Sequence, residues 1–198
     1  MIGVAKAAGL ALVTVLALVQ CGRGEVPDQS TTKKRADLSP VADVPPYWCD
    51  LVSVDALQRI TGAVSGLEEQ RSGWLVNKGG CLVRDGSPVG PLGLRWSQNE
   101  GREAVDRQRE KFVDYRPAWL EESLGYGFTV YAPSHPGDRP YYAISTFRCG
   151  QHEPWLRIDI SKVQDGRDYQ EDLTALMRIA EKRFGVLHEC EPGPVKDR

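Results

Sequence analysis

Four cysteines in the body of the chain offer its most evident chemistry: Cys49, Cys81, Cys149 and Cys190. An even number of cysteines in a small exported domain is typical of disulfide bonds, and four cysteines allow three pairings. Pairing the neighbours in sequence, Cys49 with Cys81 and Cys149 with Cys190, would join a helix to a strand in each half of the chain. We predict these two disulfides, each contributing about 3–4 kcal/mol in the chain-entropy model.

Two histidines close to the second pair of cysteines suggest an alternative. The segments Cys149-Gly-Gln-His152 and His188-Glu-Cys190 could offer two thiolates and two imidazoles to a zinc ion. Neither half has the spacing of a standard zinc finger, and thiols in an oxidising compartment are normally consumed as a disulfide. We therefore favour the disulfide, and predict no bound metal and no cofactor.

The fifth cysteine, Cys21, follows directly on an apolar segment at the start of the chain. Residues 1–8 carry a single charge, at Lys6, and residues 9–19 carry none. A weakly basic start, a short apolar run and a cysteine at its end resemble a bacterial lipoprotein signal peptide. The run is too short for a comfortable transmembrane helix, which needs about 20 apolar residues. We therefore predict a lipoprotein signal peptide over residues 1–20.

The residues before Cys21 resemble a lipobox, in which a leucine stands three positions before the modified cysteine. Leu18 and Val19 fit this pattern, whereas Gln20 stands where a small residue is usual. The alternatives are an uncleaved signal anchor, or ordinary cleavage after residues 15–17 that would leave a soluble product. We predict lipidation of Cys21, which would hold the protein on the extracytoplasmic face of the cell membrane.

The charge balance argues against a nucleic-acid partner. The whole chain has 25 Lys and Arg against 27 Asp and Glu. Removing residues 1–20 takes away only Lys6, which leaves 24 basic against 27 acidic residues and a net charge of −3. A general nucleic-acid binder would instead show a strong basic excess.

Composition divides the remaining chain into a tether, one domain and a tail. Residues 21–46 have almost no large apolar groups and cannot bury enough surface to offset their ordering entropy, which predicts a lipidated cysteine followed by a flexible tether. Residues 47–190 have the length and composition of a single domain, and residues 191–198 form a tail.

Hydrophobic periodicity predicts an α+β domain. Helices are expected over residues 54–61, with Ser53 and Gly62 as caps, over 99–112, and along an apolar stripe from Leu173 to Phe184 that Gly185 would end. Strand patterns cover residues 74–76, 81–83, 92–97, 128–130, 142–147 and 156–160. Because the links between successive strands are short, we predict an antiparallel sheet with helices packed on it as a sandwich.

No nucleophile elbow, phosphate loop or metalloprotease helix is present in the sequence. Ser134, His135 and Asp138 lie together between Pro133 and Pro140 and could act as a small hydrolase site, but the same composition is typical of a hairpin loop. We therefore predict a protein without catalytic activity, and keep a small cell-envelope hydrolase as the alternative.

Aromatic residues concentrate in the middle of the chain, on either side of the loop between Pro133 and Pro140. Most of them are expected to cover one face of the sheet. The alternative is an aromatic pocket for a glycan, peptide or lipid, because loops on a rigid scaffold often carry function. The possible ligand surface comprises Tyr131, His135, Tyr141 and Tyr142.

The chain resembles a family of actinobacterial secreted lipoproteins built on a domain of unknown function. The resemblance covers residues 47–190 and rests on Trp48-Cys49-Asp50-Leu51, on Ile60-Thr61-Gly62, on Cys81 and on the Cys149…Cys190 bracket around a strand and a long helix. An aromatic residue often follows the second cysteine of this family, where this chain has Leu82. The shared motifs imply the disulfides and no active site.

These observations lead us to expect a membrane-anchored extracytoplasmic lipoprotein that acts as a binding or interaction module. Its expected partners are the membrane, through the lipid at Cys21, and a protein, peptide or glycan of the cell envelope.

Overall fold

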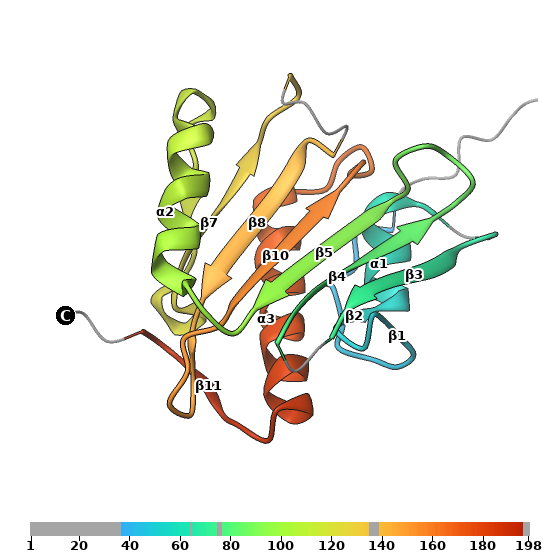
Figure 1. The fold of residues 1–198 in the computed structure, drawn as a ribbon. Helices are drawn as coiled ribbons and strands as arrows, with labels where there is room; N and C mark the ends of the chain where they lie inside the picture. The colour runs from blue at the N-terminus through green and yellow to red at the C-terminus, as the bar shows by residue number, and fades with distance from the viewer. Residues whose placement is uncertain (1–36, 64, 75–76, 135–138, 196–198) are drawn as a thin grey trace, which may run out of the picture. The chain divides into compact units, whose positions relative to one another are not determined.

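The computed structural model describes residues 37–63, 65–74, 77–134 and 139–195, all within a compact unit that runs from Arg35 to Arg198 (Figure 1). The predicted signal peptide, Cys21 and His135 lie outside the described residues. None of the described helices combines the length and the apolar character that a membrane crossing requires.

The centre of the domain is a seven-stranded sheet in which every strand pairing is antiparallel. Its strands, in spatial order, are β3 (Glu68–Gly73), β4 (Lys78–Arg84), β5 (Leu92–Ser97), β10 (Trp155–Ile160), β8 (Tyr141–Thr146), β7 (Tyr126–Tyr131) and β6 (Ala118–Trp119). Two small antiparallel pairs flank it: β1 (Tyr47–Trp48) with β2 (Val52–Ser53), and β9 (Arg148–Cys149) with β11 (Pro192–Gly193). The structure thereby confirms the predicted α+β fold with an antiparallel sheet.

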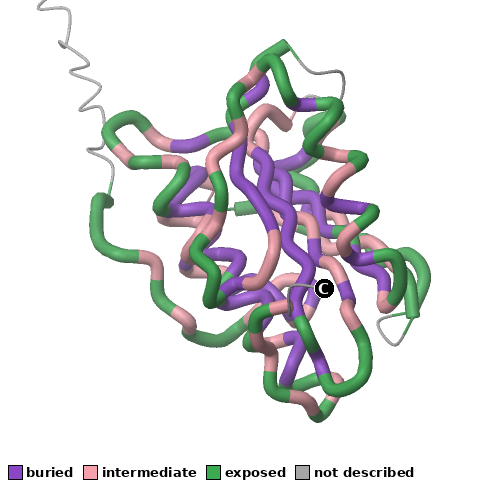
Figure 2. The backbone as a smooth tube through the Cα atoms, turned by 90° about the vertical axis from the view of Figure 1, so that its left-hand side faces the viewer, coloured by how far each residue is buried: buried purple, intermediate pink, exposed green. Residues whose placement is uncertain are grey.

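Helices lie on both faces of this sheet. The helices α1 (Val54–Thr61) and α3 (Tyr169–Leu187) lie behind the sheet in Figure 1, whereas α2 (Gly101–Lys111) lies in front of β7 and β8. The larger hydrophobic core lies on the α1 and α3 side, and a smaller one under α2 contains Val105, Phe112 and Phe128. Figure 2 shows the buried backbone concentrated in the strands between the helices. Short 3-10 turns at Val113–Tyr115 and Glu122–Leu124 complete the elements.

The first helix forms where its capping residues predict. The Ser53 hydroxyl accepts a hydrogen bond from the backbone N–H of Ala56 at 3.4 Å, which satisfies one of the free donors at the helix start. Gly62 adopts φ +75°, a left-handed conformation that glycine enters without strain and that ends the helix. Leu57 and Ile60 are fully buried between these caps.

Two predicted boundaries differ from the structure. The hairpin strand β3 is Glu68–Gly73, a polar segment for which the sequence predicts no strand. Of the strand predicted over residues 74–76, Trp74 lies just outside β3, and residues 75 and 76 lie outside the described residues. At the other end of the domain, Gly185 lies inside α3, which continues to Leu187. A Cβ atom on Gly185 would lie 2.5 Å from Pro192 Cδ and 2.6 Å from the Cys190 carbonyl oxygen, so this glycine allows close packing of the chain that follows the helix.

Residues 37–46, which the composition assigns to a tether, lie against the domain. Asp37 forms a salt bridge with Arg59 of α1, and Asp43 forms one with Lys182 of α3 at 2.6 Å. The described domain therefore begins about ten residues before Tyr47, and we call residues 37–46 the N-terminal strap. At the opposite end, residues predicted as a tail form β11.

Glu181 of α3 is a carboxylic acid inside the core, where it is only 3 % exposed. Burial raises its pKa from 4.5 to about 8, although the hydrogen bond that the Ser145 hydroxyl donates to it opposes this effect. Between pH 4.5 and 8 the folded protein therefore binds a proton that the unfolded chain has released. The contribution of Glu181 to the free energy of unfolding therefore decreases as the pH rises through this range.

We expect Glu181→Gln to raise the free energy of unfolding near pH 8, by up to about 5 kcal/mol if the whole pKa shift is recovered. The amide keeps an oxygen that accepts from Ser145, and it cannot ionise. Below pH 4.5 the acid is protonated in both states, so the two proteins should have nearly equal stability there. Denaturant unfolding across this pH range measures the difference, with the exposed Glu110→Gln as control. A stability difference that does not change with pH would contradict the prediction.

Candidate functional site

Both predicted disulfides are present. The Cα atoms of Cys49 and Cys81 are 6.0 Å apart, and those of Cys149 and Cys190 are 5.4 Å apart. The first bond ties the segment before α1 to β4, and the second ties the segment after α3 to β9. Each bond thus connects a helix end to a strand, as the sequence predicts.

The alternative zinc site lacks its thiolates, because Cys149 and Cys190 are joined to each other. The two histidines have other surroundings: His188 Nδ1 lies 3.1 Å from Gln98 Nε2, and its ring stacks on Phe184 at 4.0 Å. His152 is exposed. Among the described residues, the one cluster with metal-ligand types is Cys49, Glu69 and Cys81, and its two sulfurs also form a disulfide.

The structure brings together two of the tyrosines of the predicted ligand surface. Tyr131 and Tyr141 are directly paired on neighbouring strands, and their rings stack with centroids 4.7 Å apart. Tyr169, at the start of α3, adds a third ring at 6.0 Å from Tyr131 and 5.7 Å from Tyr141. Tyr131 is 40 % exposed, so this group, which we call the tyrosine cluster, presents aromatic surface to solvent.

Tyr142 lies on the opposite face of the sheet from the tyrosine cluster. Its side chain is 3 % exposed and packs against Phe112, with ring centroids 4.6 Å apart, in the core under α2. Burial raises the pKa of its hydroxyl. That hydroxyl has no hydrogen-bond partner among the described residues, and the guanidinium of Arg157 lies 4.9 Å from the ring centroid.

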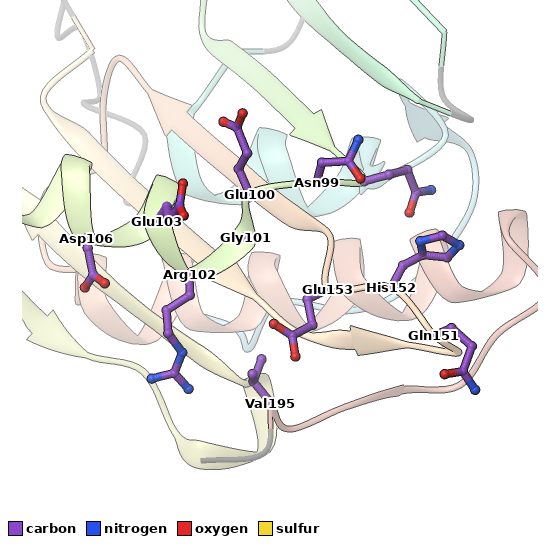
Figure 3. Close-up of a pocket in the computed structure, with 11 residues that line it drawn as sticks. Asn99, Glu100, Gly101, Arg102, Glu103, Asp106, Gln151, His152, Glu153 and Val195 are labelled. Carbon is purple, nitrogen blue, oxygen red and sulfur yellow. The ribbon is translucent and has the colours of Figure 1, made fainter. Parts of the chain in front are cut away.

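A polar pocket of about 600 Å³ opens at the N-terminal end of α2 (Figure 3). Figure 3 shows lining residues from three segments: the start of α2 with the residues before it, the Gln151–Glu153 loop, and Val195 near the end of the chain. Glu100 accepts from Arg107 at 3.1 Å, and Asp106 accepts from the Tyr126 hydroxyl at 2.7 Å. Glu103, in the first turn of α2, also interacts favourably with the positive end of the helix dipole.

The titratable side chains that line this pocket are mostly carboxylates. They comprise Glu100, Glu103, Asp106 and Glu153, together with Arg102 and His152, and the described lining includes no hydroxyl, thiol or amine side chain. Of the residues predicted for a hydrolase site, Ser134 is exposed, and His135 and Asp138 lie outside the described residues.

Another candidate surface is the face of β3, β4, β5 and β10 opposite α1 and α3. Figure 1 shows none of the described helices in front of β3, β4 and β5 on this side. We call it the open face, and its charged groups include Lys78, Arg84, Arg95, Arg139, Arg157 and Asp159.

Asp159 is the centre of an ion-pair network on the open face. Its carboxylate, 5 % exposed, accepts from Arg139 Nη1 at 3.2 Å and from Arg157 Nε at 2.9 Å. Gly93 lies directly opposite on β5 and makes room for this carboxylate, since a Cβ there would be 2.4 Å from Asp159 Oδ2. Arg95 is exposed and lies directly opposite Arg157 in the β5–β10 register. The open face can therefore bind anionic groups.

The sequence contains only part of the signal for these arginines. Arg95 alternates with the core residues Leu94 and Trp96, and Arg157 alternates with Leu156 and Ile158, so both are expected to point outward. That they face each other depends on β5 pairing with β10, a partner more than 50 residues away. Sequence periodicity carries no information about that pairing.

Comparison of the chain with protein-family models, with curated proteins and with solved structures finds no match.

Proposed function

We propose that this chain is an extracytoplasmic lipoprotein, anchored to the membrane through Cys21, whose domain acts as a binding module without catalytic activity. The pair of disulfides is the observation that carries the proposal. Disulfides form and persist in oxidising compartments outside the cytoplasm and are rare within it. An exported domain agrees with the signal-peptide pattern of residues 1–20 and with the resemblance to secreted actinobacterial lipoproteins.

The tyrosine cluster supports a binding role. Tyrosine offers both an apolar ring face and a polar hydroxyl, a combination common in protein interfaces. Tyr131 and Tyr141 come from strands, and Tyr169 comes from a helix, so the three rings are held on rigid elements. We propose that an envelope protein, peptide or glycan binds there.

Replacing Cys21 by Ser should move the protein from the membrane fraction to the medium, or leave it with an unprocessed N-terminus. The hydroxyl of serine cannot take the thioether-linked lipid, and none of the described helices has the length and apolar character of a membrane span. Fractionation and N-terminal mass determination measure the outcome. The matched variant Gln20→Ala restores the usual small residue before the cysteine and should stay in the membrane fraction. Retention of Cys21→Ser in the membrane after cleavage would rule out anchoring through this residue.

Replacing Tyr131 by Ala should weaken capture of the envelope partner with little loss of stability, because the ring is partly exposed. Immobilised full-length protein and envelope extract provide the capture assay, and thermal melts measure stability. Val113→Ala, a change at an exposed apolar residue in a different region, serves as control because Val113 is 65 % exposed. Unchanged capture by folded Tyr131→Ala and Tyr141→Ala variants would exclude the tyrosine cluster as the binding surface.

A further inference from the structure

We propose that the open face is a docking surface for an acidic segment of a partner protein, with Arg95 and Arg157 as its carboxylate-binding pair. This surface is distinct from the tyrosine cluster, which lies on the other side of the sheet.

The position of the two arginines is unfavourable without an anion. Arg95 and Arg157 are Cα partners on neighbouring antiparallel strands, and like charges directly opposite each other destabilise a sheet. The side chain of Arg95, which is exposed, forms no hydrogen bond or ion pair with any residue that the structure describes. Arg157 forms an ion pair with Asp159, and the same carboxylate forms a second ion pair with Arg139. The pair therefore keeps an excess of positive charge.

The rest of the open face also carries an excess of positive charge. Lys78 and Arg84 stand at the two ends of β4, and both are exposed on this side of the sheet. The acidic groups that the four strands place here are Glu68 and Asp159. This local excess contrasts with the net charge of −2 for the whole chain. A partner that carries several negative charges complements it.

Asp159 indicates which anion suits the surface. Two guanidinium groups of the open face already hold one carboxylate, so a second carboxylate at Arg95 would extend an arrangement that the protein contains. The planar guanidinium fork matches a carboxylate in a bidentate geometry.

The shape of the face suits an extended segment of protein. Gly80 lies opposite Arg95 on β4, so no side chain stands beside Arg95 on that strand. From Lys78 to Arg84 the strand spans about 20 Å, the length of an extended peptide of about six residues. Leu82, half-buried between them, offers apolar contact. An acidic peptide can therefore reach several cations of the open face at once.

The test measures binding of a fluorescein-labelled hexaglutamate peptide to the full-length protein in detergent micelles at low salt, by fluorescence anisotropy. Arg95→Gln and Arg157→Gln should each weaken binding by about tenfold, the usual effect of losing a charge-assisted hydrogen bond. Arg178→Gln removes the same charge from an exposed arginine of α3 that pairs with Glu121, and should leave binding unchanged.

Thermal stability separates a binding role from a structural one. If Arg95 and Arg157 repel each other in the absence of a ligand, Arg95→Gln should raise the melting temperature of the free protein. The same substitution should weaken peptide binding. A lower melting temperature with a parallel loss of binding would assign Arg95 a structural role and overturn the proposal.

Three other results would also overturn it: absence of peptide binding, equal weakening by Arg178→Gln, or binding of inorganic phosphate or phosphatidylglycerol vesicles in place of the peptide. Membrane attachment through Cys21 is measured separately by fractionation, so failure here leaves the proposed anchoring intact.

Discussion

Replacing Asp172 by Ala should lower the free energy of unfolding by about 3–5 kcal/mol. Asp172 and Arg167 form a two-pronged ion pair, with Nη2–Oδ1 at 2.5 Å and Nε–Oδ2 at 2.7 Å, and both side chains are 5 % exposed. Removing Asp172 leaves the largely buried guanidinium of Arg167 without its carboxylate partner, which is the costly outcome for such pairs. Arg167 also donates to the Ser39 carbonyl oxygen at 3.2 Å, so the substitution should loosen the N-terminal strap as well.

Denaturant unfolding gives the loss of stability, and limited proteolysis reports on the N-terminal strap. Glu121→Ala is the matched control, because Glu121 and Arg178 are both more than half exposed and such pairs contribute about 0–1 kcal/mol. The double variant Arg167→Met with Asp172→Leu should recover part of the loss, since it buries neither charge. A loss below about 1 kcal/mol for Asp172→Ala would show that water reaches the pair in solution.

Removing the Cys149–Cys190 disulfide, by Cys149→Ala with Cys190→Ala, should cost about 4 kcal/mol in the chain-entropy model. The bond closes a loop with a sequence separation of 41, and opening it gives the unfolded chain more conformations. The Cys49–Cys81 bond, with a separation of 32, should contribute nearly the same amount, because the cost of loop closure grows only with the logarithm of loop length.

Denaturant midpoints under non-reducing conditions measure both losses, and each double variant replaces both cysteines so that no free thiol remains. Peptide mapping without reduction should find the other bond intact in each variant. A loss confined to one of the two variants would mean that the entropic model fails here and that native contacts near the bonds decide their contribution.

The sequence predicts the elements that are marked by capping residues or by hydrophobic periodicity within their own segment. Ser53 and Gly62 cap α1, and the apolar stripe of α3 appears in any helical projection. The strand β3 has no such pattern, because Glu68–Gly73 is polar throughout and becomes a strand by pairing with β4. The prediction that Gly185 ends α3 is wrong, because the helix continues to Leu187 and the glycine instead allows close packing against Pro192.

In the candidate sites, too, local sequence patterns predict neighbours within a hairpin but not contacts between distant segments. Tyr131 and Tyr141 lie near each other because their strands are paired as a hairpin. Their positions on either side of one short loop predict this proximity from the sequence. Tyr142 is the next residue and faces the opposite side, as strand alternation requires. Tyr169 and the facing of Arg95 to Arg157 depend on long-range packing, and neither has a local signature.

The N-terminal strap determines how far the domain can reach. With the anchor at Cys21, as proposed, the connecting chain ends at residue 36, because the next residues are held on α1 and α3. Fifteen residues span at most about 50 Å even when fully extended. The tethered end of the domain therefore stays within that distance of the bilayer surface, and confinement of a membrane-bound partner to the same thin layer raises its effective concentration around the domain. Weak individual contacts can then suffice for capture at the membrane that would fail in free solution.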